Sequence, residues 1–160
     1  MTPRNLLLVG GLAFALPAAA MAQSLASAIV GSWAVTTVAD QYDNGKSINN
    51  WGTVKGNLSF DGNGRFTQIL VGDVQSALKG PDPRKPDAPV VAYYGTYTVN
   101  EGAKTVSFNI EAAAWSPRAG ATNTSNVEIK GDAMTLVGSA RQDQVGTFRP
   151  RLELKRVPRL

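Results

Sequence analysis

Hydrophobic and polar residues alternate along much of the chain, and the three-to-four-residue spacing of a long helix does not recur. The segment that begins at Val54 is typical, because Val54, Gly56, Leu58 and Phe60 alternate with polar neighbours. A period of two places one face of a strand in a core and the other in water. The sequence predicts eight such strands, over residues 32–38, 54–60, 65–72, 90–99, 104–112, 121–130, 134–139 and 148–157.

Turn sequences separate these segments. Asp-Gly-Asn-Gly at 61–64 predicts a hairpin, because Gly and Asn tolerate positive φ. Its oxygen atoms also suit Ca²⁺, but the further carboxylates of a calcium loop are missing, so the turn is favoured. Two connections are longer: residues 73–90, which contain four prolines and cannot form a central strand, and residues 113–120. We expect both loops at a barrel mouth.

Consecutive strands with short connections favour antiparallel pairing, since no connection holds the crossover helix that a parallel pair requires. Closing the sheet removes both exposed edges. We therefore predict an all-β fold, an eight-stranded antiparallel up-and-down barrel, with a short helical turn at 24–29 packed on one end. The interior of such a barrel has room for one small ligand.

The N-terminal residues, 1–22, have the pattern of a secretory signal peptide. Arg4 supplies the positive charge, residues 6–16 are almost entirely hydrophobic, and a small-x-small site ends at Ala22. The hydrophobic run is shorter than the ~20 residues that span a bilayer, and an uncleaved anchor is the alternative. We expect cleavage after Ala22, one domain over 23–160, a periplasmic or secreted location, and no stable membrane insertion.

Composition removes several kinds of chemistry. The chain has no His and no Cys, which excludes Ser-His-Asp and Cys-His nucleophiles and metal sites with nitrogen or sulfur ligands. No cofactor or metal is implied, and hydrophobic burial alone must stabilise the fold. There are 16 Lys and Arg against 12 Asp and Glu. The basic residues near the C-terminus lack interleaved aromatics, so we expect no nucleic-acid binding.

Several motifs resemble those of one protein family. Ile29-Val30-Gly31-Ser32-Trp33 is similar to an opening I/L-x-G-x-W motif, and residues 55–66 are similar to a GxLxFxxxGR hairpin. Residues 93–99 and 131–136 are similar to a Y-x-G-x-Y strand and a GD-x-L-x-L hairpin. By these motifs, which cover most of residues 29–137, the chain resembles the bacterial lipocalin-like domain proteins.

The resemblance implies a barrel that binds small, mainly apolar molecules. Gly31 and Trp33 would have structural roles, with Trp33 closing one end. The resemblance also implies a basic residue of the last strand stacked on this indole. Of Arg149, Arg151 and Lys155, we expect Arg151 to be that residue.

The chain departs from the family in two places. Many members have His residues after the Tyr strand, where this chain has Ser107-Phe108-Asn109, and an Arg in the next strand, where this chain has residues 123–126. Whatever those family residues bind is lost or changed here.

Strand alternation predicts the inward-facing side chains. We expect most to be core: Leu58, Phe60, Phe66, Leu70, Tyr93, Tyr97, Phe108, Ile110, Met134, Leu136, Leu152 and Leu154. Aromatic rings with Tyr hydroxyls suit an amphiphilic ligand, and Arg118 with the polar face that contains Asn126 can orient a carboxylate or hydroxyl. Trp51 and Trp115, in loops, either cap the barrel or contact a ligand. The predicted ligand-binding residues are Phe66, Tyr93, Tyr97, Phe108, Trp115, Arg118 and Asn126.

These observations favour reversible binding of a small hydrophobic or amphiphilic molecule over catalysis. One alternative is a cofactor-free isomerase or cyclase that uses Tyr and carboxylate groups, although no catalytic residue is assigned. A buried carboxylate within hydrogen-bond reach of Tyr93 or Tyr97 would favour it. A second alternative is a filled barrel that binds another protein, which an interior without a cavity would favour.

Overall fold

The structure is a computed structural model that describes residues 23–73 and 89–158. The predicted signal peptide and most of the predicted loop at 73–90 lie outside these ranges. The helices are α1 (Leu25–Ile29) and the short 3-10 helix η1 (Ser116–Arg118). The strands are β1 (Gly31–Tyr42), β2 (Ser47–Ile48), β3 (Val54–Phe60), β4 (Arg65–Gly72), β5 (Val90–Asn100), β6 (Thr105–Ala113), β7 (Thr122–Lys130), β8 (Ala133–Gly138), β9 (Arg141–Gln142) and β10 (Thr147–Arg156).

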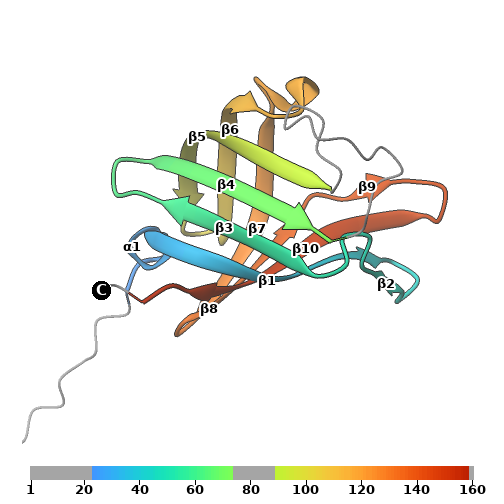
Figure 1. Cartoon of the computed structure of the whole chain (residues 1–160). Coiled ribbons are helices and arrows are strands. Elements are labelled where there is room, and N and C mark those ends of the chain that lie inside the picture. The colour runs from blue at the N-terminus through green and yellow to red at the C-terminus, as the bar shows by residue number, and fades with distance from the viewer. Residues whose placement is uncertain (1–22, 74–88, 159–160) are drawn as a thin grey trace, which may run out of the picture.

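The strands form one closed antiparallel barrel (Figure 1). Each long strand pairs with the next long strand along the chain, and β1 pairs with β10 to complete the ring. This confirms the predicted eight-stranded up-and-down barrel with its short helical turn. The two-residue strands β2 and β9 were not predicted. They extend the sheet beside the ends of β1 and β10, at the end of the barrel opposite α1.

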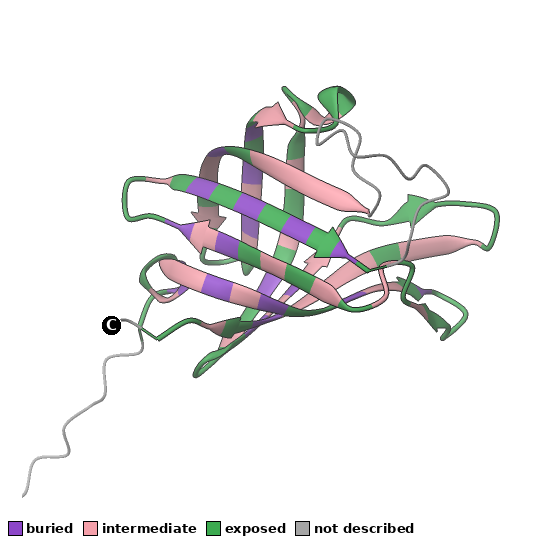
Figure 2. Ribbon diagram, in the orientation of Figure 1, coloured by how far each residue is buried: buried purple, intermediate pink, exposed green. Residues whose placement is uncertain are grey.

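The period-two pattern decides which side chains form the core. Along β4, buried and exposed residues alternate without a break (Figure 2). Phe66, Gln68 and Leu70 point inward, whereas Ile69 and Val71 lie on the outer face. Of the residues predicted to face inward, nine are fully buried and three, Tyr93, Tyr97 and Leu152, are partly buried against the same core.

One irregularity changes the face that β1 presents. Its register with β10 shifts between Val35 and Thr37, so Trp33 and Val35 are buried before the shift and Val38 and Tyr42 after it. A bulge of this kind bends the strand and increases its twist. The strand also continues to Tyr42, beyond the predicted end at Val38.

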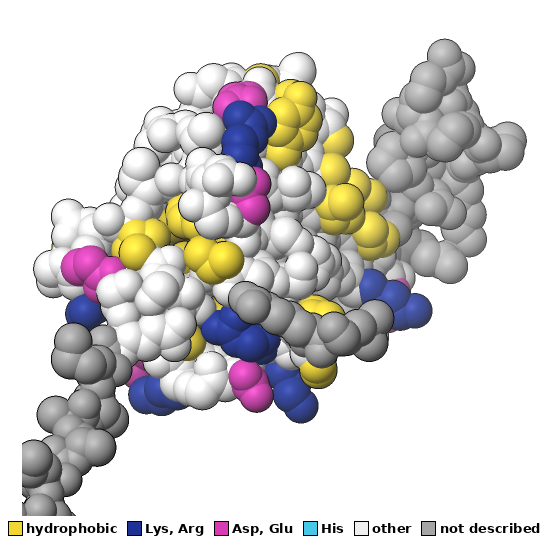
Figure 3. Space-filling model, turned by 90° about the vertical axis from the view of Figure 1, so that its left-hand side faces the viewer, with side chains coloured by type: hydrophobic (Ala, Val, Ile, Leu, Met, Phe, Trp, Pro, Cys, Tyr) yellow, Lys and Arg dark blue, Asp and Glu magenta, His cyan; other side chains and the backbone are white. Residues whose placement is uncertain are grey.

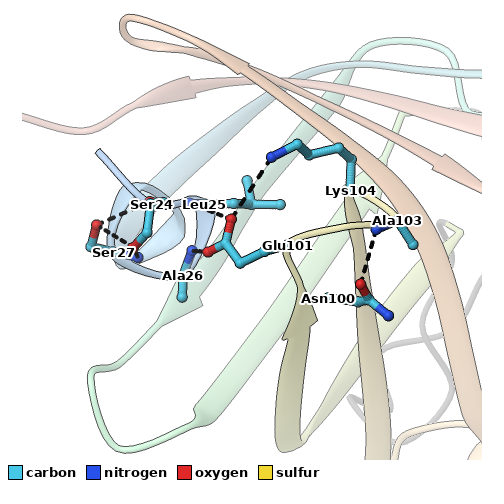
Figure 4. A network of polar contacts seen from close by, with 8 residues as sticks. All are labelled: Ser24, Leu25, Ala26, Ser27, Asn100, Glu101, Ala103 and Lys104. Atoms are coloured by element: carbon cyan, nitrogen blue, oxygen red, sulfur yellow. Dashed lines mark hydrogen bonds and ion pairs between the residues drawn. The ribbon is translucent and has the colours of Figure 1, made fainter. Parts of the chain in front are cut away.

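Helix α1 packs on one end of the barrel, as predicted, and its free backbone donors have partners (Figure 4). The Glu101 carboxylate, from the turn after β5, accepts hydrogen bonds from Leu25 N at 3.0 Å and from Ala26 N at 2.8 Å. The Ser24 hydroxyl accepts a third, from Ser27 N at 3.2 Å. A helix this short is unstable alone, so these contacts fix it to the barrel.

The carbonyl groups at the C-terminus of α1 also have partners. The Trp33 indole, which is fully buried, donates to Ile29 O at 2.8 Å. The Arg156 guanidinium lies over that indole, 4.0 Å from the ring centroid. It also donates to Ala28 O at 2.6 Å and to Val30 O at 3.0 Å. Trp33 and Arg156 together close this end of the barrel.

The expectation that Arg151 covers Trp33 is therefore wrong, and strand register is the reason. Trp33 is paired with Arg156, whereas Arg151 lies opposite Ala39. Arg156 lies on the same face of β10 as Leu154, which points inward. Arg151 lies on the opposite face of the strand, where its side chain forms an ion pair with Glu153.

Gly31 has a geometric reason to precede Trp33. Its φ is +130°, a conformation that L side chains rarely adopt, and a Cβ there would lie 3.0 Å from Arg156 Nη1. The Gly-x-Trp spacing therefore brings the indole and the guanidinium together.

The surface on the side of α1 is mixed. Figure 3 shows hydrophobic side chains in groups among polar atoms, with Lys and Arg side chains spread around the face. Across the described ranges, no helix has the length and hydrophobicity needed to cross a membrane.

Candidate ligand-binding cavity

A cavity of about 430 Å³ opens at the end of the barrel opposite α1. Its walls come from the ends of β1, β4 and β8, from the starts of β5, β7 and β10, and from the segments that carry Trp51, Arg118 and Arg141. Cavities of ~300–1,000 Å³ are typical for small-molecule sites. The barrel interior is therefore only partly filled by its own side chains.

Part of the cavity wall is hydrophobic. Leu70, Phe108, Leu136 and Leu152 line it, and all four point inward from different strands. Phe66 lies behind this wall and packs edge-on against Phe108, with ring centroids 4.9 Å apart. The aromatic cluster holds the wall in one arrangement because its rings interlock.

One side of the cavity is polar. Gln68 is 6 % exposed and lies opposite Tyr93 in the β4–β5 pairing. Burial raises the pKa of Tyr93, whereas the charges of Arg118 and Arg141 and a side-chain hydrogen bond with Gln68 act in the opposite direction. The Tyr93 hydroxyl therefore lies near both arginines and stays neutral at pH 7.

Three charged side chains lie around the mouth. Arg141 is exposed, but the surrounding protein still desolvates its guanidinium and lowers its pKa, and the nearby charge of Arg118 lowers it further. Partial burial raises the pKa of Asp40, against the opposing effects of a hydrogen bond from Asn50 Nδ2 at 3.3 Å and the charge of Arg141. Two cations and one carboxylate thus share one opening.

The Trp51 loop forms another part of the wall. The backbone carbonyl of Trp51 accepts a hydrogen bond from Asp73 N at 3.1 Å, and the Asp73 carboxylate accepts one from Thr53 N at 2.7 Å. Gly72 permits this close approach, because a Cβ there would lie 2.4 Å from Trp51 O. The partly buried indole is therefore held at the cavity by its own backbone contacts.

The structure brings together three of the seven predicted ligand-binding residues. Tyr93, Phe108 and Arg118 line the cavity. Phe66 is packed behind it, as described above. Tyr97 lies toward the closed end, where its hydroxyl donates to Asp61 O at 2.7 Å and its ring packs on Phe60.

The other two lie away from the cavity lining. Trp115 is 62 % exposed, with its ring 5.7 Å from the Arg118 guanidinium carbon. Asn126 is exposed on the outer face of β7. Asn123 and Ser125 lie on the other face of this strand, point inward and line the cavity. Both faces of β7 are polar, and the face that contains Asn123 is the inner one.

The predicted ligand-binding residues do not include Gln68, Asp40 or Arg141, which also line the cavity. Gln68 shares a strand face with Phe66 and Leu70, and a polar residue in an inward position is itself a signal for a site. Asp40 enters the barrel only because of the bulge in β1. Arg141 lies between β8 and β10, and it reaches the cavity because it pairs with Phe148 of β10.

The fold and the cavity define this chain as a closed eight-stranded antiparallel β-barrel with an internal cavity at one end, part hydrophobic and part polar. Comparisons with protein-family models, with curated proteins and with solved structures gave no match. Within the described residues, no group of three or more Asp and Glu side chains is placed to hold a metal ion.

Proposed function

We propose that this protein is an exported, lipocalin-like carrier that binds one small hydrophobic or amphiphilic molecule inside its barrel. The observation that carries the proposal is the cavity of about 430 Å³, whose lining combines a hydrophobic wall with polar and charged groups. Transfer of an apolar ligand from water to such a wall is favourable, and a few polar groups then fix its orientation. The family assignment rests on the sequence motifs, and export rests on the signal pattern of residues 1–22.

The hydrogen bonds of the two inner tyrosines argue against the enzymatic alternative. In the described part of the chain, Tyr93 interacts with the Gln68 amide and Tyr97 with a backbone carbonyl, so neither has a carboxylate partner there. The cavity argues against the third alternative, since a barrel that serves only as a scaffold needs no internal space.

Equilibrium binding of the neutral fluorescent probe N-phenyl-1-naphthylamine tests the proposal. We expect saturable binding of one molecule per barrel. The variant Ser125→Phe places a ring in the cavity and is expected to weaken binding by about tenfold or more, since bulk that cannot be accommodated costs ~1–3 kcal/mol. The matched control is Asn126→Phe, one residue away on the outer face, which should leave the affinity unchanged.

Amide chemical shifts of the unmodified protein provide a test without any variant. Titration with the probe should move the signals of Leu70, Phe108 and Leu136 more than those around α1. Absence of saturable binding, or shifts confined to the outer face, would contradict the proposal.

A further inference from the structure

We propose that the cavity selects amphiphiles with a single carboxylate, whose head group lies at the mouth between Arg118 and Arg141 and whose apolar part lies along the hydrophobic wall. This inference rests on the proposed function and specifies the class of ligand. It is carried by the placement of the two guanidinium groups and by the charges around them.

The Arg118 side chain is oriented by its surroundings. It extends from η1, where Nη1 donates to Asn123 Oδ1 at 3.4 Å and the exposed Trp115 ring lies on another side of the guanidinium. Asn123 points into the cavity from β7. These contacts leave Arg118 partly buried along the cavity wall, with donors available to a ligand.

Arg141 reaches the same opening from a different part of the fold. It begins β9, which pairs with β10 at Phe148, and both residues line the cavity. The charge of Arg118 acts on Arg141, and the charges of both arginines act on Tyr93. Arg118 of η1, Arg141 of β9 and Tyr93 of β5 therefore all present hydrogen-bond donors to the same cavity.

Two like charges in a partly desolvated opening repel each other, and a bound anion removes that repulsion. Each of the other four Arg side chains in the described ranges lies within ion-pair distance of a carboxylate: Arg65, Arg149, Arg151 and Arg156. Among the described residues, neither Arg118 nor Arg141 has an Asp or Glu within that distance. Charge-assisted hydrogen bonds from two guanidinium groups are a strong and specific match for a carboxylate.

The charge balance favours a monoanion. Of the charged side chains that line the cavity, Arg118 and Arg141 contribute two positive charges, and Asp40, when ionised, contributes one negative charge. Asp143, whose charge also acts on Asp40, accepts a hydrogen bond from the Tyr42 hydroxyl and is not one of the lining residues. One net positive charge remains, which a single carboxylate neutralises. A dianionic phosphate would leave an excess of negative charge next to Asp40. Leu70, Phe108 and Leu136 provide the apolar surface for the rest of the ligand.

The experiment compares decanoate with its neutral analogue methyl decanoate by displacement of N-phenyl-1-naphthylamine. For the unmodified protein, we expect decanoate to bind about tenfold tighter or better, since hydrogen bonds to charged groups are worth ~1.5–3 kcal/mol. Arg118→Gln and Arg141→Gln should each reduce decanoate affinity by a similar factor and change methyl decanoate affinity by less than about twofold. Circular dichroism checks that the variants fold.

The matched control is Arg149→Gln, which removes one exposed charge from β10 near the same end. It should leave both affinities unchanged, because exposed charges outside the cavity are screened by salt. In the unmodified protein, decanoate affinity should also fall when the pH is lowered far enough to protonate the ligand, which tests the head group without a variant.

The outcomes separate the two proposals. If the neutral probe and methyl decanoate bind but decanoate binds no better, the carboxylate inference is overturned and the carrier proposal stands. If none of the three binds, the carrier proposal fails. If decyl phosphate binds tighter than decanoate, the mouth is an anion site but the assignment to a monocarboxylate is overturned.

Discussion

The two ends of this barrel are built from the same strands but use polar groups in opposite ways. At the closed end, the polar and charged groups around α1 contact one another: Glu101 accepts from the first amides of the helix, and Trp33 and Arg156 donate to its last carbonyls. At the open end, Arg118, Arg141 and Tyr93 face a cavity. Polar groups that are satisfied internally stabilise a fold, whereas polar groups left facing a cavity are available to a ligand.

The two ends also differ in the elements that surround them. α1 covers one end with five residues. At the other end, β1 and β10 continue beyond the barrel with β2 and β9 beside them (Figure 1). Trp51 and Arg118 of η1 line the cavity at this end. Substitutions at the closed end should therefore affect stability most, and substitutions at the open end should affect binding most.

The largest expected effect on stability is that of Trp33→Ala. Removing this fully buried ring and its hydrogen bond to Ile29 should lower the free energy of unfolding by about 3–5 kcal/mol. Urea denaturation followed by circular dichroism measures it. The control Trp115→Ala removes an exposed indole at the open end and should change stability by less than about 0.5 kcal/mol. Equal losses for the two variants would contradict the division between the ends.

A smaller loss is expected for Arg156→Met, which keeps much of the side-chain volume. It removes the stacking on Trp33 and the hydrogen bonds to Ala28 and Val30, so we expect a loss of about 2–3 kcal/mol. Arg151→Met is the matched control on the same strand, and its partly exposed pair with Glu153 should contribute less than about 1 kcal/mol. If Arg151→Met cost as much as Arg156→Met, the assigned register would be wrong.

The closed end should also respond to acid through Glu101. Hydrogen bonds from the Ala26 and Leu25 amides lower its pKa below the ordinary 4.5, so the unfolded chain binds this proton more readily. The stabilisation is therefore present above that ordinary value and is lost as the pH falls through the lowered one. Glu101→Gln should be less stable than the unmodified protein at pH 7, and the difference should shrink toward pH 3. A difference that stays constant over this range in urea denaturation would contradict the assignment.

The smallest effect on stability is expected at the open end. Arg118→Gln and Arg141→Gln should each change the free energy of unfolding by less than about 0.5 kcal/mol, since both side chains are at least partly exposed. For Arg141→Gln the change should be toward higher stability, because the substitution removes a guanidinium that the surrounding protein desolvates and that the charge of Arg118 repels. Thermal unfolding without ligand measures this. A large loss of stability would show that the two arginines serve the fold and not a ligand.

Much of the fold was predictable from local pattern. Alternation located the eight long strands and the inward positions, because a side-chain period of two follows directly from strand geometry. The Asp-Gly-Asn-Gly turn and the helical turn before Gly31 were predictable for the same reason, since both depend on neighbouring residues. The candidate site was predictable only in part: Tyr93, Phe108 and Arg118 line the cavity, while Trp115 and Asn126 lie outside it.

The remaining errors come from contacts between distant segments. The choice of Arg156 over Arg151 depends on the register between β1 and β10, and the inward position of Asp40 depends on the bulge in β1. Arg141 reaches the mouth because β9 pairs beside β10. None of these strand pairings can be predicted from the residues next to each position in the sequence.

The sequence by itself determined the all-β class, the turns and the faces of the strands, because each of these follows from residues a few positions apart. Only the tertiary structure decided which arginine covers Trp33 and which charged groups share the cavity. Those features require strands far apart in the chain to adopt one register, and register is decided by the packing of the whole barrel.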